Sequence, residues 1–143
     1  NGGASTLESY GVKVDFADGF GMAELLELQE RFKKALPARH LEFYRNLAFT
    51  HQEGDYLFVH AGIRPGVPLE NQSDEDMLWI REEFLDSHAN HGKVIVHGHT
   101  ITWEPEFRGN RIGVDTGAFT SGTLTSLVLE SHEQDVLQVD ATK

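Results

Sequence analysis

Two apolar runs in this chain end in histidine and glycine, and they constrain the fold more than any other feature. The first is Tyr-Leu-Phe-Val-His-Ala-Gly at 56–62, and the second is Val-Ile-Val-His-Gly-His-Thr at 94–100. A short apolar run bounded by turn residues predicts a buried strand. α/β proteins commonly bind ligands at the carboxyl ends of such strands, where a glycine turn leaves room. The two segments therefore predict a metal or phosphate site at the strand ends of an α/β chain.

Composition narrows the kind of site and the kind of partner. The 143 residues, 39% of them hydrophobic, suffice for one domain with a buried core. Cysteine is absent, so a metal must be held by imidazole and oxygen ligands, which suits Mn, Fe, Zn or Ni. The net charge of −11 argues against nucleic-acid binding, which needs a basic surface. Because no apolar run approaches the length of a membrane span and no signal peptide is visible, we expect a cytoplasmic protein without membrane association.

Apolar periodicity predicts a helical part over 22–47 and a β-rich part over 48–140, which gives an α/β (α+β) fold class. Residues 1–20 are glycine-rich and predict turns. One helix is expected from Met22 to Pro37, and a second, over 38–47, is expected to bury Leu41, Tyr44 and Leu47. Ser73 is the expected N-cap of a third helix. Asp76, three residues later, is at the position whose side chain can bond back to the N-cap residue. The expected strands are 48–52, 56–60, 93–97, 111–114, 124–129 and 136–139, the last two forming a hairpin with a turn at 131–134.

The histidines of the two opening segments are the candidate metal ligands. Alone, His60 at a strand end most often makes a capping hydrogen bond. His97 and His99 are two residues apart, so both leave the same face if the segment is extended. Such a pair can chelate one metal, or one histidine can ligate while the other packs or hydrogen-bonds. The remaining histidines lie in polar surroundings and are expected at the surface; they are 40, 51, 88, 91 and 132.

Two charged residues are further candidates, each with a simpler alternative. Arg81, expected on a short helix, could present a bidentate guanidinium to a phosphate. A surface ion pair with one of the acidic residues at 82, 83 and 86 fits its local context equally well. Asp115 precedes a glycine turn and could be a metal ligand or support one. An aspartate in this position more often forms the turn by hydrogen-bonding its own backbone.

Six motifs in order resemble the C-terminal part of the bacterial calcineurin-like metallophosphoesterases, closest to their serine/threonine protein phosphatase (PPP) branch. The resemblance covers essentially all of 1–143. Its motifs are Asn-Gly-Gly-x-x-Thr-Leu-x-Ser-Tyr-Gly (1–11), Phe-Val-His-Ala-Gly (58–62), Leu-Trp-Ile-Arg-Glu (78–82), Val-His-Gly-His-Thr (96–100), Ile-Gly-Val-Asp-Thr-Gly-Ala (112–118) and Leu-Thr-Ser-Leu-Val-Leu-Glu (124–130). It implies a β-sandwich flanked by helices, with two divalent metal ions at the strand ends. The implied substrates are phosphorylated proteins, dinucleotide polyphosphates or small phosphoesters.

The resemblance also implies roles for particular residues. His60 and His99 occupy the positions of two ligands to the second metal, and His97 is their expected support. Arg81 occupies the position of the arginine that binds the substrate phosphate. The implied reaction is attack on phosphorus by a metal-bridging hydroxide, without a phosphoenzyme.

Three family motifs are missing from these 143 residues: Asp-x-His, Gly-Asp-x-x-Asp-Arg-Gly and Gly-Asn-His-Glu. In the family they supply the aspartate and asparagine ligands, the first histidine ligand and the general acid. We therefore expect at most one partial metal site and little or no phosphatase activity from this chain alone. We also expect exposed sheet edges and apolar faces, which favour self-association or pairing with the missing N-terminal half.

Two further interpretations stay open at this point. The chain could be a non-catalytic remnant or interaction module on the same scaffold, which would bind one metal weakly through His60 and His99. Alternatively, it could be a metal hydrolase of another fold, in which His97, His99, His60 and Asp115 form a complete mononuclear site. In the second case, loss of His97 would weaken metal binding as strongly as loss of His99.

Overall fold

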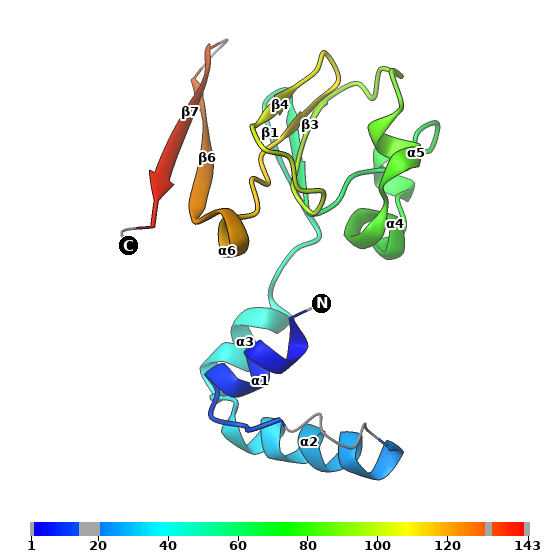
Figure 1. The fold of residues 1–143 in the computed structure, drawn as a ribbon. Helices are drawn as coiled ribbons and strands as arrows, with labels where there is room; N and C mark the ends of the chain where they lie inside the picture. The colour runs from blue at the N-terminus through cyan, green and yellow to red at the C-terminus, as the bar shows by residue number, and fades with distance from the viewer. Residues whose placement is uncertain (1, 15–20, 131–132, 142–143) are drawn as a thin grey trace. The chain divides into compact units, whose positions relative to one another are not determined.

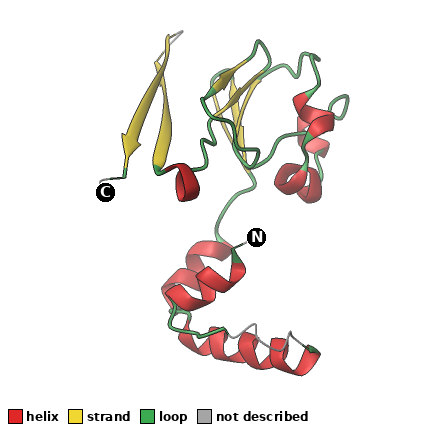
Figure 2. Cartoon of the chain, in the orientation of Figure 1, coloured by secondary structure: helices red, strands yellow, loops and turns green. Residues whose placement is uncertain are grey.

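A computed structural model describes residues 2–14, 21–130 and 133–141. The chain divides into two compact units, Asn1–Leu47 and Ala48–Lys143. Among the described residues, the first unit is helical and the second contains the strands (Figures 1 and 2). No described helix combines the length and the apolar character needed to cross a membrane.

The first unit contains α1 (Gly3–Ser9), α2 (Met22–Ala35) and α3 (Ala38–Arg45). The helix starts predicted at Met22 and at residue 38 are confirmed by α2 and α3, and Pro37 separates the two helices. The prediction of turns over 1–20 is wrong for Gly3–Ser9, because the glycines with positive φ, Gly2 at 68° and Gly11 at 77°, flank the helix. Residues 15–20 of that predicted stretch lie outside the described residues.

Burial in the first unit differs from the prediction. None of its three helices contains a buried residue. Leu41, Tyr44 and Leu47 are 38%, 50% and 57% exposed, so their predicted burial is wrong. The helical period places these residues on one face, but burial also requires a partner, and within this unit that face remains open. Tyr10 contacts both longer helices: its ring lies 5.4 Å from that of Phe32, and its hydroxyl lies 2.9 Å from His40 Nδ1.

The second unit is built on a five-stranded mixed sheet in the order β1-β2-β3-β5-β4. Its strands are β1 (Thr50–Glu53), β2 (Tyr56–Val59), β3 (Val94–His97), β4 (Glu106–Phe107) and β5 (Arg111–Gly113). The central strands β2, β3 and β5 are parallel, and the edge strands are antiparallel. The apolar runs that predicted buried strands therefore form the parallel centre of the sheet. Most of β3 is buried, whereas β2 alternates between half-buried and buried residues. The short strand β4 was not predicted.

Short helices follow β2 and hold the chain beside the sheet. They are the 3-10 helix Leu69–Asn71, α4 (Asp74–Trp79) and α5 (Glu82–Leu85). The Ser73 cap is confirmed, since its Oγ accepts from the Asp76 amide at 3.1 Å. The prediction that Arg81 lies on a helix is wrong: it lies between α4 and α5, with φ −134° and ψ −105°.

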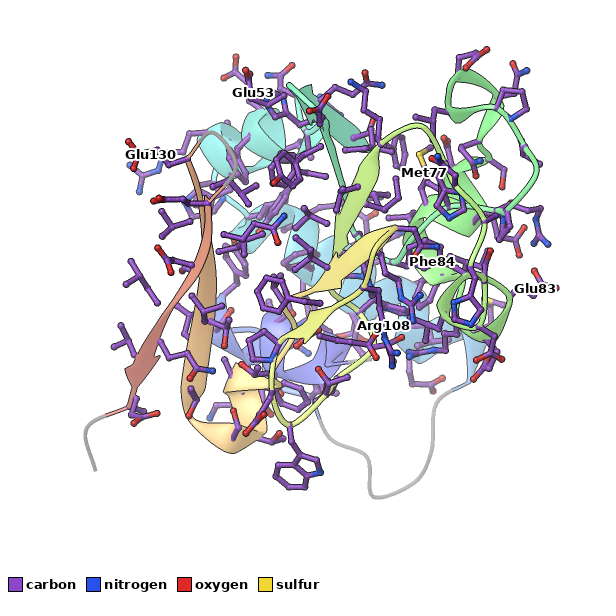
Figure 3. All side chains as sticks on the ribbon, turned by 90° about the horizontal axis from the view of Figure 1, so that it is seen from above. Glu53, Met77, Glu83, Phe84, Arg108 and Glu130 are labelled. Carbon is purple, nitrogen blue, oxygen red and sulfur yellow. The ribbon has the colours of Figure 1, made fainter. Side chains whose placement is uncertain are left out.

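The core of the second unit forms between the central strands and these helices. Phe84 is fully buried, together with Leu57, Ile63, Ile95 and Ile112. Met77 and Phe84 point from the helical segment into this core (Figure 3). Gly62 permits the packing, because a Cβ there would lie 2.3 Å from Cδ1 of Phe84. The glycine of the His-Ala-Gly segment thus lets the strand end approach a buried aromatic ring.

A two-stranded sheet completes the second unit. After α6 (Ala118–Ser121), β6 (Thr123–Glu130) pairs with β7 (Glu133–Asp140), which confirms the predicted hairpin. Of the predicted turn, 131–132 lie outside the described residues. Gln134 Nε2 donates to the Tyr56 hydroxyl at 2.9 Å, which links the hairpin to β2. One face of β6 is half-buried, while Leu124 and Val128 on the other face are exposed.

Candidate metal and phosphate site

The candidate site lies where the parallel strands end. Because β2 and β3 are parallel neighbours, their carboxyl ends meet at one edge of the sheet. His60 follows β2 and His97 ends β3. Backbone hydrogen bonds join these ends: Gly98 N donates to His60 O at 2.9 Å, and Val114 N donates to His97 O at 2.9 Å. The backbone from which the candidate histidines project is therefore held by the sheet.

His60 and His99 face one another across this edge. His60 Nε2 lies 3.1 Å from His99 Nδ1, and the ring centroids are 4.9 Å apart. His99 is the non-glycine residue with positive φ in the described chain, at 63°, and this turn brings its ring toward His60. The Trp79 ring meets His99 edge-on at 5.7 Å. Two histidines 39 positions apart in sequence thus present their nitrogens to a common point.

His97 does not join that pair. It is 3% exposed, packs edge-on against Phe84 at 5.0 Å, and donates from Nδ1 to Gly98 O at 3.2 Å. The expectation that His97 and His99 leave the same face is wrong, because the extended strand ends at His97 and the left-handed backbone at His99 turns the chain. Among the described residues, no group of three or more histidine, aspartate or glutamate side chains is arranged to hold a metal ion.

Asp115 lies close behind the histidine pair. Its Oδ1 accepts from Gly117 N at 3.0 Å, the self-bonded turn that was the simpler alternative for this residue. A Cβ at Gly98 would meet Asp115 Cβ at 3.5 Å, so glycine gives the two loops room to approach. Asp115 therefore shapes the strand ends in this structure, and its role as a metal ligand or support stays a prediction.

Arg81 points to the same edge from the junction of α4 and α5. Its Nη1 donates to Thr100 Oγ1 at 3.0 Å and to His99 O at 3.4 Å. The ion pairs found among the described residues do not include one between Arg81 and an acidic neighbour. Its side chain is exposed. An accessible guanidinium beside the histidine pair is suited to bind a phosphate.

The surroundings favour the neutral form of two of these histidines, His97 and His99. The pKa of His99 is lowered, first by burial and then by the positive charges of Arg81 and His60, while Asp115 acts in the opposite direction. Burial is also the main cause that lowers the pKa of His97. A neutral imidazole has a free lone pair and is the form that ligates metals.

His60 and His99 share a hydrogen bond between their rings in this structure, and the spacing of the two nitrogens would also allow one divalent cation to bind both. Imidazole nitrogens bind such metals at about 2.0–2.1 Å, so two nitrogens on one ion lie no more than about 4.2 Å apart. The observed 3.1 Å meets this condition. The described residues bring two nitrogen donors together here, and the charge and open access at Arg81 suit an anionic ligand beside them.

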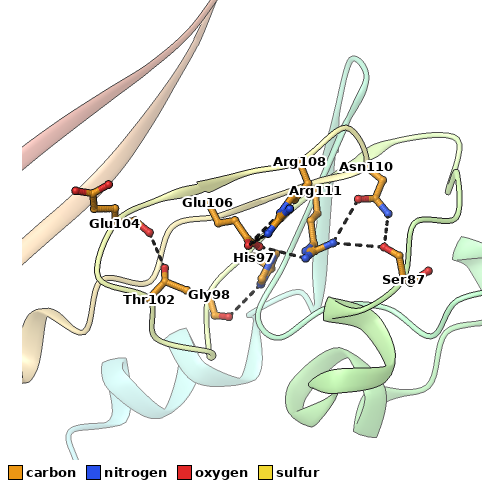
Figure 4. Close-up of polar contacts among 9 residues, drawn as sticks. All are labelled: Ser87, His97, Gly98, Thr102, Glu104, Glu106, Arg108, Asn110 and Arg111. Carbon is orange, nitrogen blue, oxygen red and sulfur yellow. Dashed lines mark hydrogen bonds and ion pairs between the residues drawn. The ribbon is translucent and has the colours of Figure 1, made fainter.

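Sequence reasoning missed a polar cluster behind the histidine pair. Arg111, 4% exposed, begins strand β5, and its Nη2 donates to Glu106 Oε2 at 3.2 Å (Figure 4). The sequence feature that could have indicated this cluster is an arginine inside the apolar segment 111–114.

His91 was expected at the surface, but it is half-buried, with its ring 6.1 Å from that of Phe84. His132 lies outside the described residues.

No protein-family model matches the chain. In sequence, it is 26% identical over 137 residues to the asymmetrical bis(5′-nucleosyl)-tetraphosphatase PrpE of Anoxybacillus flavithermus. That alignment covers 85% of this chain and 55% of the relative. In structure, it matches a crystal structure described as a candidate diadenosine tetraphosphatase, with a TM-score of 0.65 and 16% identity. The match covers 83% of this chain and 62% of that chain.

The chain shares the fold of that crystal structure. The predicted mixed α/β fold of the metallophosphoesterase type is thereby confirmed. The chain spans about half the length of the curated relative that it matches. The names of both proteins describe tetraphosphatases of dinucleoside tetraphosphates.

Proposed function

We propose that this chain provides one metal-binding and phosphate-binding half of a metal-dependent phosphoester hydrolase. The observation that carries the proposal is the 3.1 Å approach of His60 Nε2 and His99 Nδ1 at the strand ends, with Arg81 bonded to the next residue, Thr100. These three side chains come from separate segments and meet at one accessible edge. The family resemblance gives the same residues the same roles.

Each residue has a definite task in this proposal. His60 and His99 would hold a divalent cation; with no thiolate in the chain, Mn, Fe, Zn and Ni are all candidates, and Mn²⁺ is the probe used below. Arg81 would bind two phosphate oxygens and orient the phosphoryl group toward the histidine pair. The cation, when bound, would supply Lewis-acid stabilisation of charge on the phosphoryl oxygens. His97 would position the loop that carries His99 through its bond to Gly98 O.

The proposed substrate class is the nucleoside polyphosphates. It is supported by the sequence similarity to an asymmetrical bis(5′-nucleosyl)-tetraphosphatase. The PPP branch also contains protein phosphatases, so phosphorylated proteins are the competing class. The two classes are separated by assaying diadenosine tetraphosphate beside a phosphoserine peptide.

We expect weak metal binding and little turnover from the 143 residues alone, because the described residues gather two nitrogen donors and no third ligand at this edge. In the family, both cations are bridged by a carboxylate from the missing motifs, and such two-metal sites stabilise both attacking and leaving oxygens. Manganese-dependent hydrolysis of p-nitrophenyl phosphate by a chain of verified mass would contradict this expectation.

The test of the function is manganese binding by the whole chain, followed by the electron paramagnetic resonance of free Mn²⁺. His60→Ala and His99→Ala should each weaken binding at least tenfold, while His97→Ala should change it less, because His97 faces Gly98 and not the cation. The binding of inorganic phosphate in the presence of Mn²⁺ should be lost in Arg81→Ala and partly kept in Arg81→Lys. Equal manganese binding by the parent, His60→Ala and His99→Ala would refute the proposal.

A further inference from the structure

Arg81 is held in place by two neutral oxygen atoms. Its Nη1 donates to Thr100 Oγ1 at 3.0 Å and to His99 O at 3.4 Å. Both acceptors belong to the loop that follows β3, whereas Arg81 lies at the junction of α4 and α5. One nitrogen of the guanidinium therefore ties the candidate phosphate ligand to the loop that carries the candidate metal ligand His99.

The other three arginines of the second unit are held differently. Arg64, Arg108 and Arg111 each pair with a carboxylate, and the last two are drawn in Figure 4. A carboxylate fixes a guanidinium but also offsets its positive charge, so an incoming anion has to compete with it. A hydroxyl and a carbonyl fix the group without that opposing charge. Arg81 is thus held in a defined position and keeps its charge for an anion.

Two nitrogens of Arg81 stay available to a ligand. A guanidinium has five N–H donors, one on Nε and two on each Nη nitrogen. Among the described residues, the acceptors of Arg81 contact Nη1 and not Nε or Nη2, and the side chain is exposed. The Nε–H and one Nη2–H lie side by side on one edge of the planar group, an arrangement that matches two oxygens of a phosphate. The contacts therefore favour this edge over the end formed by Nη1 and Nη2.

Thr100 is a fixed anchor for this arrangement. Its backbone nitrogen donates to Gly98 O at 2.7 Å, across the turn that contains His99. Its side chain is half-buried, and within the described chain its hydroxyl bonds to Arg81 alone. An arginine side chain loses rotamer freedom when it binds an anion, and one that is already held loses less. The hydroxyl therefore prepares Arg81 for binding.

We propose that Thr100 is a positioning residue for phosphate binding: its hydroxyl holds Arg81 Nη1, so that the Nε–Nη2 edge receives two phosphate oxygens. The inference rests on the proposed function and deepens it at the phosphate-binding part of the site. Thr100 contacts neither the phosphate nor the cation and acts through Arg81. Loss of its hydroxyl should therefore weaken phosphate binding and leave metal binding unchanged.

The experiment titrates inorganic phosphate, without metal and at constant ionic strength, into the whole chain labelled with ¹⁵N-arginine. The Arg81 Nε–H signal is identified by its absence from Arg81→Lys, and phosphate should shift it in a saturable way. Thr100→Val removes the hydroxyl at nearly constant size and should raise the dissociation constant of phosphate about tenfold, the loss expected for one hydrogen bond to a charged group. Thr100→Ser restores a hydroxyl and should bind phosphate as the parent chain does.

Thr102→Val is the matched control. Thr102 is half-buried like Thr100 and lies two residues further along the same loop, but its hydroxyl donates to Glu104 O at 2.7 Å. The same substitution there should leave phosphate binding unchanged. Manganese binding by the same variants, followed by electron paramagnetic resonance, reports whether the histidine pair is intact. Thr100→Val should match the parent chain in that measurement.

The possible results separate this inference from the proposed function. Parent-like phosphate binding by Thr100→Val, an equal loss in Thr102→Val, or a loss of manganese in Thr100→Val as large as its loss of phosphate overturns the positioning role. An Arg81 Nε–H signal that phosphate does not move overturns the binding edge. If Thr100→Val binds phosphate normally while Arg81→Ala does not, the proposed function stands without this inference. If Thr100 behaves as expected but His60→Ala and His99→Ala keep manganese, the inference stands and the metal site falls.

Discussion

Both units of this chain contain helices, but the units differ in what those helices cover. In the first unit, α1, α2 and α3 contain no buried residue. In the second, α4 and α5 each bury one residue, Met77 and Phe84, against a sheet whose Leu57 and Ile95 are at most 2% exposed. Periodicity alone therefore predicts a helix, while burial depends on a partner surface. The candidate site lies at the edge of the part that has this partner.

The largest effect is expected when a buried phenylalanine of the second unit is compared with an exposed phenylalanine of the first. Phe84→Ala should destabilise the second unit by about 3–5 kcal/mol, because it removes a fully buried ring and leaves a cavity. Phe43→Ala, on the 62% exposed Phe43 of α3, should change stability by no more than about 0.5 kcal/mol. Urea unfolding followed by tryptophan fluorescence measures the effect in the second unit, since Trp79 and Trp103 both lie there.

A loss in Phe43→Ala as large as that in Phe84→Ala would break the comparison. It would mean that the helices of the first unit are as well packed as the sheet. Far-UV circular dichroism on the same samples shows whether the helical signal is lost together with the tryptophan signal.

A finer test uses two glycines of the segment that follows β2. Gly62→Ala adds a methyl group that would lie 2.3 Å from the buried Phe84 ring, and Gly62 also has a φ of 154°. Gly66→Ala adds a methyl group in open space at a φ of 80°, so it carries backbone strain of roughly 1–2 kcal/mol and no collision. Gly62→Ala should therefore cost about 1–3 kcal/mol more than Gly66→Ala, the usual range for overpacking. Urea midpoints that agree for the two variants would show that Phe84 can move aside, and that the core is looser than its burial indicates.

The sequence predicted those features that depend on nearest neighbours and on strand pattern. The apolar runs, the Ser73 cap and the C-terminal hairpin were predicted because each is specified locally. Spacing alone could not predict that His97 and His99 point apart, because this depends on where the strand ends and on one positive φ at His99. Their unequal roles were implied only by the family resemblance and stay a prediction. The pair between the buried Arg111 and the half-buried Glu106 was missed, because it depends on residues brought together by β4 and β5, and β4 is only two residues long.

The smallest expected effect concerns pH and a histidine that touches the buried core. The pKa of His91 is lowered in the folded chain, first by burial and then by Arg111. As the pH falls below about 6.5, the ordinary value for histidine, the unfolded chain takes up a proton before the folded chain does, so stability decreases. Above that range the ring is neutral in both states and contributes no pH dependence.

His91→Gln should therefore lose less stability between pH 7 and pH 5 than the parent chain. His88→Gln, at an exposed position nearby, is the matched control and should keep the parent's pH dependence. Because burial also lowers the pKa of His97, part of the slope should remain in His91→Gln. Thermal unfolding at a series of pH values measures these slopes, and a His91→Gln slope as steep as that of the parent chain would show that His91 does not contribute to the loss of stability at low pH.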